Sequence, residues 1–221
     1  MIKCCIFDLD GTLLSTLETI TFHLNNTLRQ EGLSEITLDE CRAFIGDGAR
    51  KLVGRAIAKS GVTDTATLER VLRVYNEAYN DSPLPETEPY PGITELIDRL
   101  YSSGINLAVV TNKPERTARL LIDHFFEGRF SAVVGGREGV PLKPDPTSSL
   151  GVIGSLGLAS GETAFIGDTA VDITTGRNMC AALSVGVCWG FRSEDELLGA
   201  GADALAHTAD ELSRIILGRG V

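Results

Sequence analysis

The amino-acid sequence predicts an α/β fold, in which a parallel sheet with helices on both faces forms the core and an all-helical segment is inserted near the N-terminus. Two observations predict the core: continuous apolar runs recur along the 221 residues, and helix-like stretches separate them. The third observation is that the interval from about residue 15 to residue 85 has helical periodicity and no convincing strand. With 43% hydrophobic residues, the chain is long enough for one sizeable core and an accessory module.

Five apolar runs bounded by turn residues predict buried parallel strands, at 2–7, 105–110, 130–134, 163–166 and 183–188. Helix starts are predicted wherever a Thr or Ser stands three residues before a Glu, because this spacing is typical of a capping box. The three pairs are Thr37 and Glu40, Ser193 and Glu196, and Thr208 and Glu211.

The helical interval carries three apolar stripes, each with the spacing of one helix face. Their members are Leu17, Ile20, Leu24 and Leu28; Leu52, Val53, Ala56 and Ile57; and Leu68, Val71, Leu72 and Tyr75. The chain then returns through the proline-rich segment 83–92, which is stiff enough for an interdomain hinge. We therefore predict a catalytic core of residues 1–14 and 86–221, and a helical cap of residues 15–85 that closes over the site, excludes water and selects the substrate.

The composition of the chain limits the kinds of partner that it is expected to bind and the compartments in which it is expected to occur. The net charge of −10, from 20 basic and 30 acidic residues, repels nucleic acid and anionic membranes, so neither is expected to bind. The chain enters a strand at once, without the basic segment and long apolar run of an export signal, so neither export nor membrane anchoring is expected. The five cysteines lack metal-finger spacing and are expected to be small buried hydrophobes in a reducing compartment, the cytoplasm. We expect a monomer or a homodimer.

The sequence Asp8-Leu9-Asp10-Gly11-Thr12 closes the first apolar run with two carboxylates two residues apart. Because side chains alternate along a strand, Asp8 and Asp10 leave on the same side, and Gly11 lets the backbone turn away. Two like charges so close require a cation or unequal roles. A divalent metal would leave one carboxylate free as a nucleophile and the other free to transfer protons. The simpler alternative is a strand that ends in a polar turn.

Thr111-Asn112-Lys113-Pro114 ends the second apolar run. The Thr111 hydroxyl, the Asn112 side chain and backbone N–H groups near the following helix start can all donate hydrogen bonds to a phosphate. Pro114 is expected at the first helical position. The alternative is an ordinary strand-to-helix loop with Thr as a cap.

Lys143 lies between Pro141, Pro144 and Pro146, which forbid a helix and hold its surroundings stiff. A lysine presented from a fixed loop can pair with both a nucleophilic Asp and the oxygens of a transferring phosphoryl group. By itself a surface lysine is usually solvated.

Gly167-Asp168 ends the fourth apolar run, and Asp172 follows four residues later. If a helix begins in between, this spacing places the two carboxylates on one face, as one metal ligand and one ligand or orienting group. With Asp8 and a backbone carbonyl at Asp10, the set suits Mg²⁺. A capping Asp with a solvated neighbour would also account for the pattern.

Each motif stands at the carboxyl end of a predicted strand, where open α/β sheets place their sites. In order and spacing the four resemble motifs I to IV of the haloacid dehalogenase superfamily, and the helical insertion resembles that of its C1-cap members with their Rossmann-like core. Closer still, 45–50 (Ile-Gly-Asp-Gly-Ala-Arg), 111–114 (Thr-Asn-Lys-Pro) and 142–146 (Leu-Lys-Pro-Asp-Pro) resemble the phosphoglycolate phosphatase subgroup. Ser15 departs from that subgroup, which usually has Asp there.

The resemblance implies a Mg²⁺-dependent phosphoric monoester hydrolase that converts 2-phosphoglycolate to glycolate. It implies that Asp8 forms an aspartyl phosphate and that Asp10 protonates the leaving alkoxide and later activates water. Further roles follow in the same way: Thr111, Asn112 and Lys143 hold the phosphoryl oxygens, Asp8, Asp10, Asp168 and Asp172 hold Mg²⁺, and Gly46, Gly48 and Arg50 of the cap contact the rest of the substrate.

Alternatives remain open at this point. Pyrophosphate, a sugar phosphate or a nucleotide monophosphate could be the substrate. A β-phosphoglucomutase-type mutase uses the same two aspartates, although Thr12 is typical of the phosphatases. A dehalogenase would be expected to lack Asp10. Outside the family, a phospho-acceptor signalling domain combines similar residues, but its phosphorylated Asp lies on a later strand, and a catalytically silent binding protein needs none of them.

Overall fold

The core is a six-stranded parallel sheet with the strand order β5-β4-β1-β6-β7-β8. The computed structural model describes residues 1–218, so the last three residues of the predicted core segment, 219–221, lie outside the described part. The strands are β1 (Cys4–Phe7), β4 (Asn106–Pro114), β5 (Ala132–Gly136), β6 (Thr163–Gly167), β7 (Leu183–Val187) and β8 (Ala204–Ala206). The predicted α/β class is confirmed. Because β1 is central, its carboxyl end lies beside those of β4 and β6.

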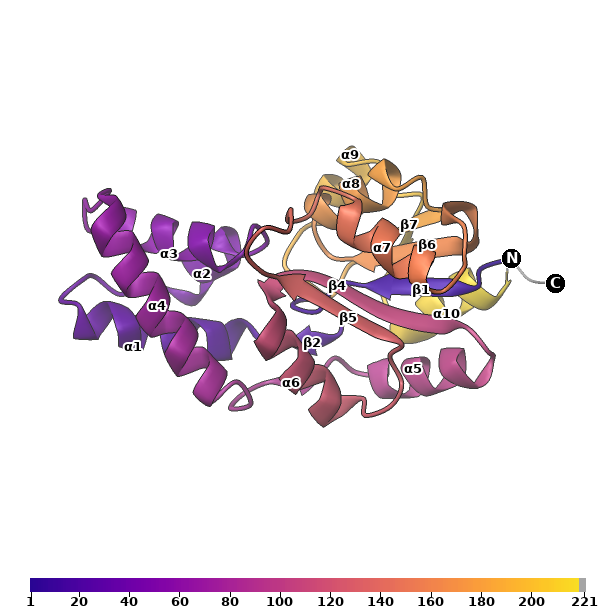
Figure 1. Ribbon diagram of the computed structural model, residues 1–221, viewed down its shortest axis with the longest axis horizontal. Helices are drawn as coiled ribbons and strands as arrows, with labels where there is room; N and C mark the ends of the chain where they lie inside the picture. The colour runs from indigo at the N-terminus through magenta and orange to yellow at the C-terminus, as the bar shows by residue number, and fades with distance from the viewer. Residues whose placement is uncertain (219–221) are drawn as a thin grey trace.

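Alternation along β1 explains why both faces of the sheet are covered. Cys5 and Phe7 belong to one apolar cluster, and Cys4 and Ile6 belong to another. Helices α5 (Ile93–Ser102), α6 (Glu115–Phe125) and α10 (Ala209–Leu217) supply the first cluster. The second is covered by α7 (Thr147–Ser155), with α8 (Ala170–Asn178) packed against β6 and β7. Figure 1 shows these two layers on opposite sides of the sheet. The remaining short elements are the 3₁₀ turn Ser160–Glu162 and α9 (Glu194–Gly199).

Four helices follow β1 and form a separate layer at the end of the molecule away from the two termini (Figure 1). They are α1 (Leu17–Gln30), α2 (Leu38–Phe44), α3 (Ala49–Ala58) and α4 (Thr65–Asp81). Every residue of the three predicted stripes belongs to, or packs against, one apolar cluster between these helices. Phe191, from the loop after β7, joins the same cluster and so contacts the helical layer from the core side.

A two-stranded antiparallel ribbon, β2 (Leu14–Ser15) with β3 (Glu88–Pro89), stands where the chain leaves and re-enters the core. The sequence did not predict it, because two-residue strands carry no periodicity. The strand β8 was also missed, since Ala-Leu-Ala has no β-branched residue.

Local details differ from the expectations at the end of β4, at two of the predicted capping pairs and at two cysteines. The β4 strand extends to Pro114, which caps α6 and is not its first helical residue. Thr37 and Glu40 form the full capping box, whereas Ser193 and Thr208 accept only the backbone bond. Cys180 is exposed and Cys188 half-buried, so the expectation of five buried cysteines is wrong for these two. Among residues 1–218, no helix is both long and apolar enough to span a membrane.

The close packing of α8 on the sheet gives a test of the fold. A Cβ at Gly176 would lie 2.9 Å from the Phe165 Cβ and 3.1 Å from the Ser184 Cβ, in a fully packed layer. Gly176→Ala is therefore expected to destabilise the protein by about 1–3 kcal/mol, despite the better helix propensity of Ala. Gly54 in α3 is the matched control, because its Cβ would meet only the Leu68 Cδ1, at 3.9 Å. Gly54→Ala is expected to stabilise by about 0.5–1 kcal/mol. Urea unfolding measures both, and equal stabilities would contradict the packing described.

Candidate active site

A cavity lies between the carboxyl edge of the sheet and the helical layer, lined from both sides. The core contributes the last residues of β4, one residue of α6 and residues that follow β1, β6 and β7, and the helical layer contributes mostly apolar side chains. The lining residues are Asp8, Asp10, Thr111, Asn112, Lys113, Pro114, Thr117, Thr169 and Phe191 from the core, and Ile20, Ile45, Gly46, Gly48, Ala49, Leu52, Tyr75, Asn76 and Tyr79 from the helical layer. The topology thus brings together residues more than 180 positions apart in the sequence, such as Asp8 and Phe191.

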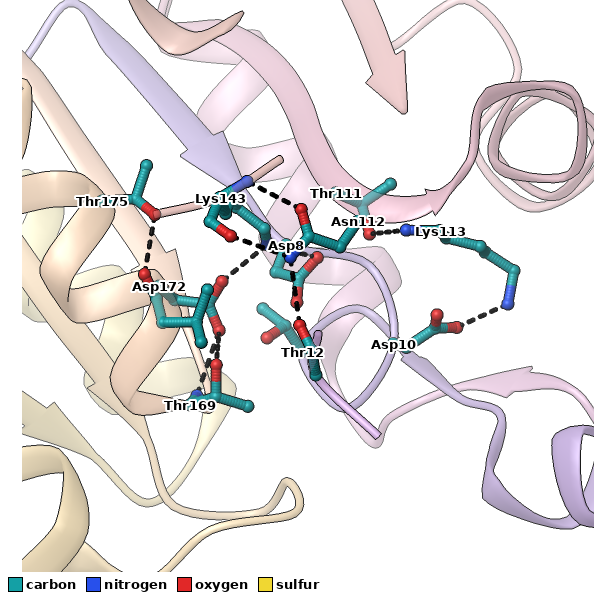
Figure 2. A network of polar contacts seen from close by, with 12 residues as sticks. Asp8, Asp10, Thr12, Thr111, Asn112, Lys113, Lys143, Thr169, Asp172 and Thr175 are labelled. Atoms are coloured by element: carbon teal, nitrogen blue, oxygen red, sulfur yellow. Dashed lines mark hydrogen bonds and ion pairs between the residues drawn. The ribbon is translucent and has the colours of Figure 1, made fainter. Parts of the chain in front are cut away.

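Lys143 links two buried aspartates next to this cavity (Figure 2). Its Nζ lies 2.8 Å from the Asp8 Oδ1 and 2.6 Å from the Asp172 Oδ1. The Asp172 Oδ2 accepts bonds from the Thr169 N–H and hydroxyl, at 3.1 and 2.7 Å, and so caps α8. Burial alone would lower the pKa of Lys143, but the carboxylates of Asp172 and Asp8 outweigh it and raise that pKa. Lys143 is therefore a fixed cation beside Asp8.

Asp168 is fully buried and held by two donors. The Thr12 hydroxyl donates to its Oδ1 at 2.9 Å, and the Phe191 N–H donates to its Oδ2 at 2.8 Å. The backbone passes so close that a Cβ at Gly11 or Gly190 would overlap the Asp168 carboxyl group, and Gly11 also has a φ of 82°. Two loops are thus shaped around one carboxylate.

Asp8, Asp168 and Asp172 form a buried acidic cluster, with one oxygen of each within 4.8 Å of the others. Burial, opposed by Lys143 and assisted by the charge of Asp172, raises the pKa of Asp8 to about 6. Burial, and then the charges of Asp172 and Asp8, raise the pKa of Asp168 well above its usual range. The Asp8 Oδ1 has no aligned hydrogen-bond donor among the described residues, although Lys143 lies beside it. Three crowded, buried carboxylates beside a single ammonium fit a site for a hard divalent cation.

Asp10 lies apart from this cluster. Its Oδ1 pairs with the Nζ of Lys113 at 2.8 Å (Figure 2), and the residue lines the cavity. The Asp10 carboxylate is therefore not gathered with the three clustered carboxylates, and a metal contact from its backbone carbonyl stays a prediction.

Thr111 and Asn112, near the end of β4, differ in whether their side chains are free to bind a ligand. The Thr111 Oγ1 accepts the Lys113 N–H at 3.3 Å, which leaves its hydroxyl hydrogen for a ligand. The Asn112 amide is already committed, since its Nδ2 donates to the Gly46 and Lys143 carbonyls at 3.1 and 3.2 Å and its Oδ1 accepts the Lys143 N–H at 2.8 Å. In this structure the Asn112 side chain therefore fixes the Lys143 loop and the Gly46 loop in place, and its contact with a phosphate stays a prediction.

Of the three site residues predicted in the helical layer, only two lie at the cavity. Gly46 and Gly48 line the cavity, but Arg50 does not. Arg50 is the second residue of α3, and its guanidinium lies 2.5 Å from Glu69 of α4 on the exposed side of both helices. The structure therefore does not bring Arg50 to the site, because its helix face points to α4.

Two residues that carry no assigned role in the sequence analysis stand in the cavity wall. Lys113 pairs with Asp10 and donates to the Tyr79 hydroxyl at 2.9 Å. Lys113 could have been singled out, since it directly follows Thr111 and Asn112 at a strand end. Tyr79 gave no signal beyond an aromatic residue in a helix, because its contact depends on the docking of α4 on the core.

Comparison with known proteins agrees with this geometry. A family profile described as haloacid dehalogenase-like hydrolase matches residues 5–184. The chain is 34% identical to phosphoglycolate phosphatase 1 of Pseudomonas aeruginosa over 226 residues, which cover 97% of this chain and 82% of that protein. It is 36% identical to a phosphoglycolate phosphatase of Rhodospirillum rubrum, over 80% of this chain and 76% of that one. A crystal structure of a proposed phosphoglycolate phosphatase from Lactobacillus delbrueckii subsp. bulgaricus superposes with a TM-score of 0.92 at 33% identity, covering 98% of both chains.

Proposed function

Because this chain belongs to the haloacid dehalogenase-like hydrolase family, and its curated relatives are phosphatases, we propose that it hydrolyses 2-phosphoglycolate to glycolate and phosphate through a phosphoenzyme on Asp8. The observation that carries this proposal is the position of Asp8: its carboxylate lines the cavity and is ion-paired with a buried lysine. A carboxylate held by a fixed cation keeps one orientation toward a ligand while its charge is partly offset.

In this proposal the Asp8 carboxylate attacks phosphorus in line, and the bond between phosphorus and the alcohol oxygen breaks. Lys143 offsets the charge on Asp8 and on the phosphoryl oxygens, and the Thr111 hydroxyl donates to one of those oxygens. Asp10, on the cavity side, gives its proton to the leaving alkoxide. It then takes a proton from the water that attacks the aspartyl phosphate, which restores Asp8 and releases phosphate.

We propose Mg²⁺ as the cofactor. Asp8 and Asp168, with a backbone carbonyl at Asp10, would hold it, and Asp172 would orient Lys143 at the edge of the site. Support comes from the three crowded carboxylates, whose charge one ammonium offsets only in part. When bound, Mg²⁺ would offset the charge that Lys143 leaves uncompensated and polarise the transferring phosphoryl group.

The helices α1 to α4 are proposed to be a cap, residues 15–85, on a core of residues 1–14 and 86–221. Support comes from their separate apolar cluster and from the short ribbon at the junction. The side of the cavity formed by this layer is largely apolar, which suits the exclusion of water from a small substrate. We further propose a cytoplasmic location, in keeping with five free cysteines.

A substrate panel tests the proposal. With Mg²⁺ present, phosphate release is expected to be fastest from 2-phosphoglycolate, by about tenfold or more in kcat/KM over pyrophosphate, sugar phosphates and nucleotide monophosphates. Excess EDTA is expected to abolish release from all of them, and added Mg²⁺ to restore it. A preference for another compound would replace the substrate and keep the phosphatase. Full activity in EDTA would overturn the metal-dependent mechanism.

A further inference from the structure

Lys113 stands at the centre of a buried contact between the core and the helical layer. Its Nζ lies 2.8 Å from the Asp10 Oδ1, 2.9 Å from the Tyr79 hydroxyl and 4.3 Å from the centre of the Tyr79 ring. The Lys113 side chain is only 4% exposed, and that of Asp10 is 13% exposed. An ammonium so far from water depends on these two partners, because the loss of either leaves it partly unsolvated.

Tyr79 comes from α4, so one of the two partners belongs to the helical layer. Its ring is fixed by stacking on Tyr75, at 5.8 Å between ring centres, and by an edge contact with His23 at 5.2 Å. Burial raises the pKa of the Tyr79 phenol, so it stays neutral and accepts from the ammonium. The adjacent Asn80 accepts a hydrogen bond from Thr117 of α6, a second contact between this end of α4 and the core.

We infer that Lys113 is a positioning residue for Asp10, and that Tyr79 makes this positioning depend on the docking of α4 against the core. The inference rests on the proposed function, in which Asp10 protonates the leaving group. While α4 is docked, the ammonium holds the Asp10 Oδ1 and fixes the carboxyl group, so that the other oxygen, Oδ2, carries the proton for the leaving alkoxide. When α4 withdraws, Lys113 loses Tyr79 and its surroundings open to water, so Asp10 loses its fixed orientation. The acid is thus assembled only over an enclosed substrate.

A different role for Lys113 is recognition of a carboxylate on the substrate. The geometry favours Asp10, because the ammonium is already paired with it and is held in that position by Tyr79. Three small phosphates separate the roles: 2-phosphoglycolate has an alkoxide leaving group and a carboxylate, ethyl phosphate has the alkoxide without the carboxylate, and acetyl phosphate releases acetate, which needs no proton.

The test is kcat/KM for the three compounds with Lys113→Met, since this ratio reports the steps up to formation of the phosphoenzyme. Positioning of the acid predicts a fall of about 10- to 100-fold for 2-phosphoglycolate and ethyl phosphate, as part of the 10²–10⁴ that general acid catalysis supplies, and a small change for acetyl phosphate. Asp10→Asn is expected to show the same pattern with a larger amplitude. A fall for 2-phosphoglycolate alone would overturn the inference in favour of carboxylate recognition. Equal falls for all three would show a merely structural role.

Tyr79→Phe removes one hydroxyl and is the milder variant if Lys113→Met fails to fold. It is expected to give the same selective pattern at about 3- to 10-fold, the size of one hydrogen bond. Arg192→Ala is the matched control, because Arg192 also joins core to cap, through the Arg42 and Ile45 carbonyls at 2.8 and 2.7 Å, without touching Asp10. Its three kcat/KM values are expected to change together. If it reproduces the pattern of Tyr79→Phe, the specific link to Asp10 is wrong.

Lys113→Arg keeps the charge and is expected to recover part of the loss of Lys113→Met with the two alkyl phosphates, whereas no recovery would count against positioning by charge. The results that would contradict the proposed function differ from those that would contradict this inference. If wild type hydrolyses none of the three compounds, or Asp8→Asn hydrolyses them as fast as wild type, the phosphatase mechanism itself is wrong.

Discussion

Asp8→Asn is expected to lower kcat by about 10³-fold or more and, in the presence of a chelator, to raise the melting temperature. The loss of turnover follows from the loss of the nucleophile, because an amide oxygen beside Lys143 cannot form the phosphoenzyme. The gain in stability follows from the geometry. Asp8, Asp168 and Asp172 crowd three buried carboxylates against one ammonium, so removal of one charge relieves repulsion.

The pKa of Asp8 also predicts that the Asp8→Asn variant is more stable than wild type. It rises from 3.8 to about 6 in the folded protein, chiefly through burial, so the ionised form costs stability at neutral pH. Lys143 keeps Asp172 as a partner in the variant. We expect a gain of about 1–3 kcal/mol, or about 2–6 °C.

Differential scanning calorimetry in EDTA, with and without excess Mg²⁺, measures the stability effect. Wild type is expected to gain stability on adding Mg²⁺ and Asp8→Asn to gain much less, since a carboxylate ligand is missing. Asp98→Asn is the control: Asp98 pairs with Arg129 at 2.6 Å on the surface, so its loss should change stability by less than about 1 kcal/mol. A lower melting temperature for Asp8→Asn in EDTA would contradict the crowding described.

Lys143→Met is expected to abolish turnover as well, but with the opposite effect on stability. The methionine fills most of the space of the lysine stem and removes the ammonium, which leaves Asp8 and Asp172 as buried charges without a counterion. Breaking a buried ion pair in this way costs about 3–5 kcal/mol. Turnover falls because Asp8 and the phosphoryl oxygens lose the cation that offsets their charge.

The double variant Asp8→Asn/Lys143→Met tests the physical cause of this loss of stability. If the cost comes from uncompensated carboxylates, Asp8→Asn is expected to return part of the lost stability, so that the two changes are not additive. Lys3→Met is the matched control, because Lys3 makes an equally short ion pair, 2.6 Å from Glu162, with a side chain that is 55% exposed. It should cost less than about 1 kcal/mol. Urea unfolding of the four variants in EDTA measures the effect, and strict additivity would show that Lys143 acts mainly through packing.

Part of the site could be predicted because it follows from strand ends. Asp8, Thr111 and Asp168 each come directly after an apolar run, and parallel strands deliver their carboxyl ends to one edge of a sheet. Lys143 could be singled out because three prolines mark its loop. Asn112 lines the cavity, but its amide faces the Lys143 and Gly46 loops, because loops from other parts of the chain decide which polar group a side chain meets.

Site residues in the helical layer were harder to predict from the sequence, because a helix has several faces and the sequence does not say which face meets the core. Arg50 stands two residues from a cavity glycine, yet its guanidinium turns toward Glu69. Tyr79 lies in an amphipathic helix like many other aromatic residues, yet its hydroxyl reaches Lys113. Both outcomes depend on how α4 packs, on α3 in one case and against the core in the other.

The sequence by itself determined the α/β class, the helical insertion and the four strand-end motifs, because periodicity and punctuation by glycine and proline act over a few residues. Only the tertiary structure decided which charges meet. The pairing of Lys143 with both Asp8 and Asp172, the capture of Asp168 by Thr12 and Phe191, and the bridge from Tyr79 through Lys113 to Asp10 all join distant segments. Buried ion pairs and hydrogen bonds of this kind depend on distances of a few ångström, which are fixed by the packing of whole elements and not by the order of residues within any one of them.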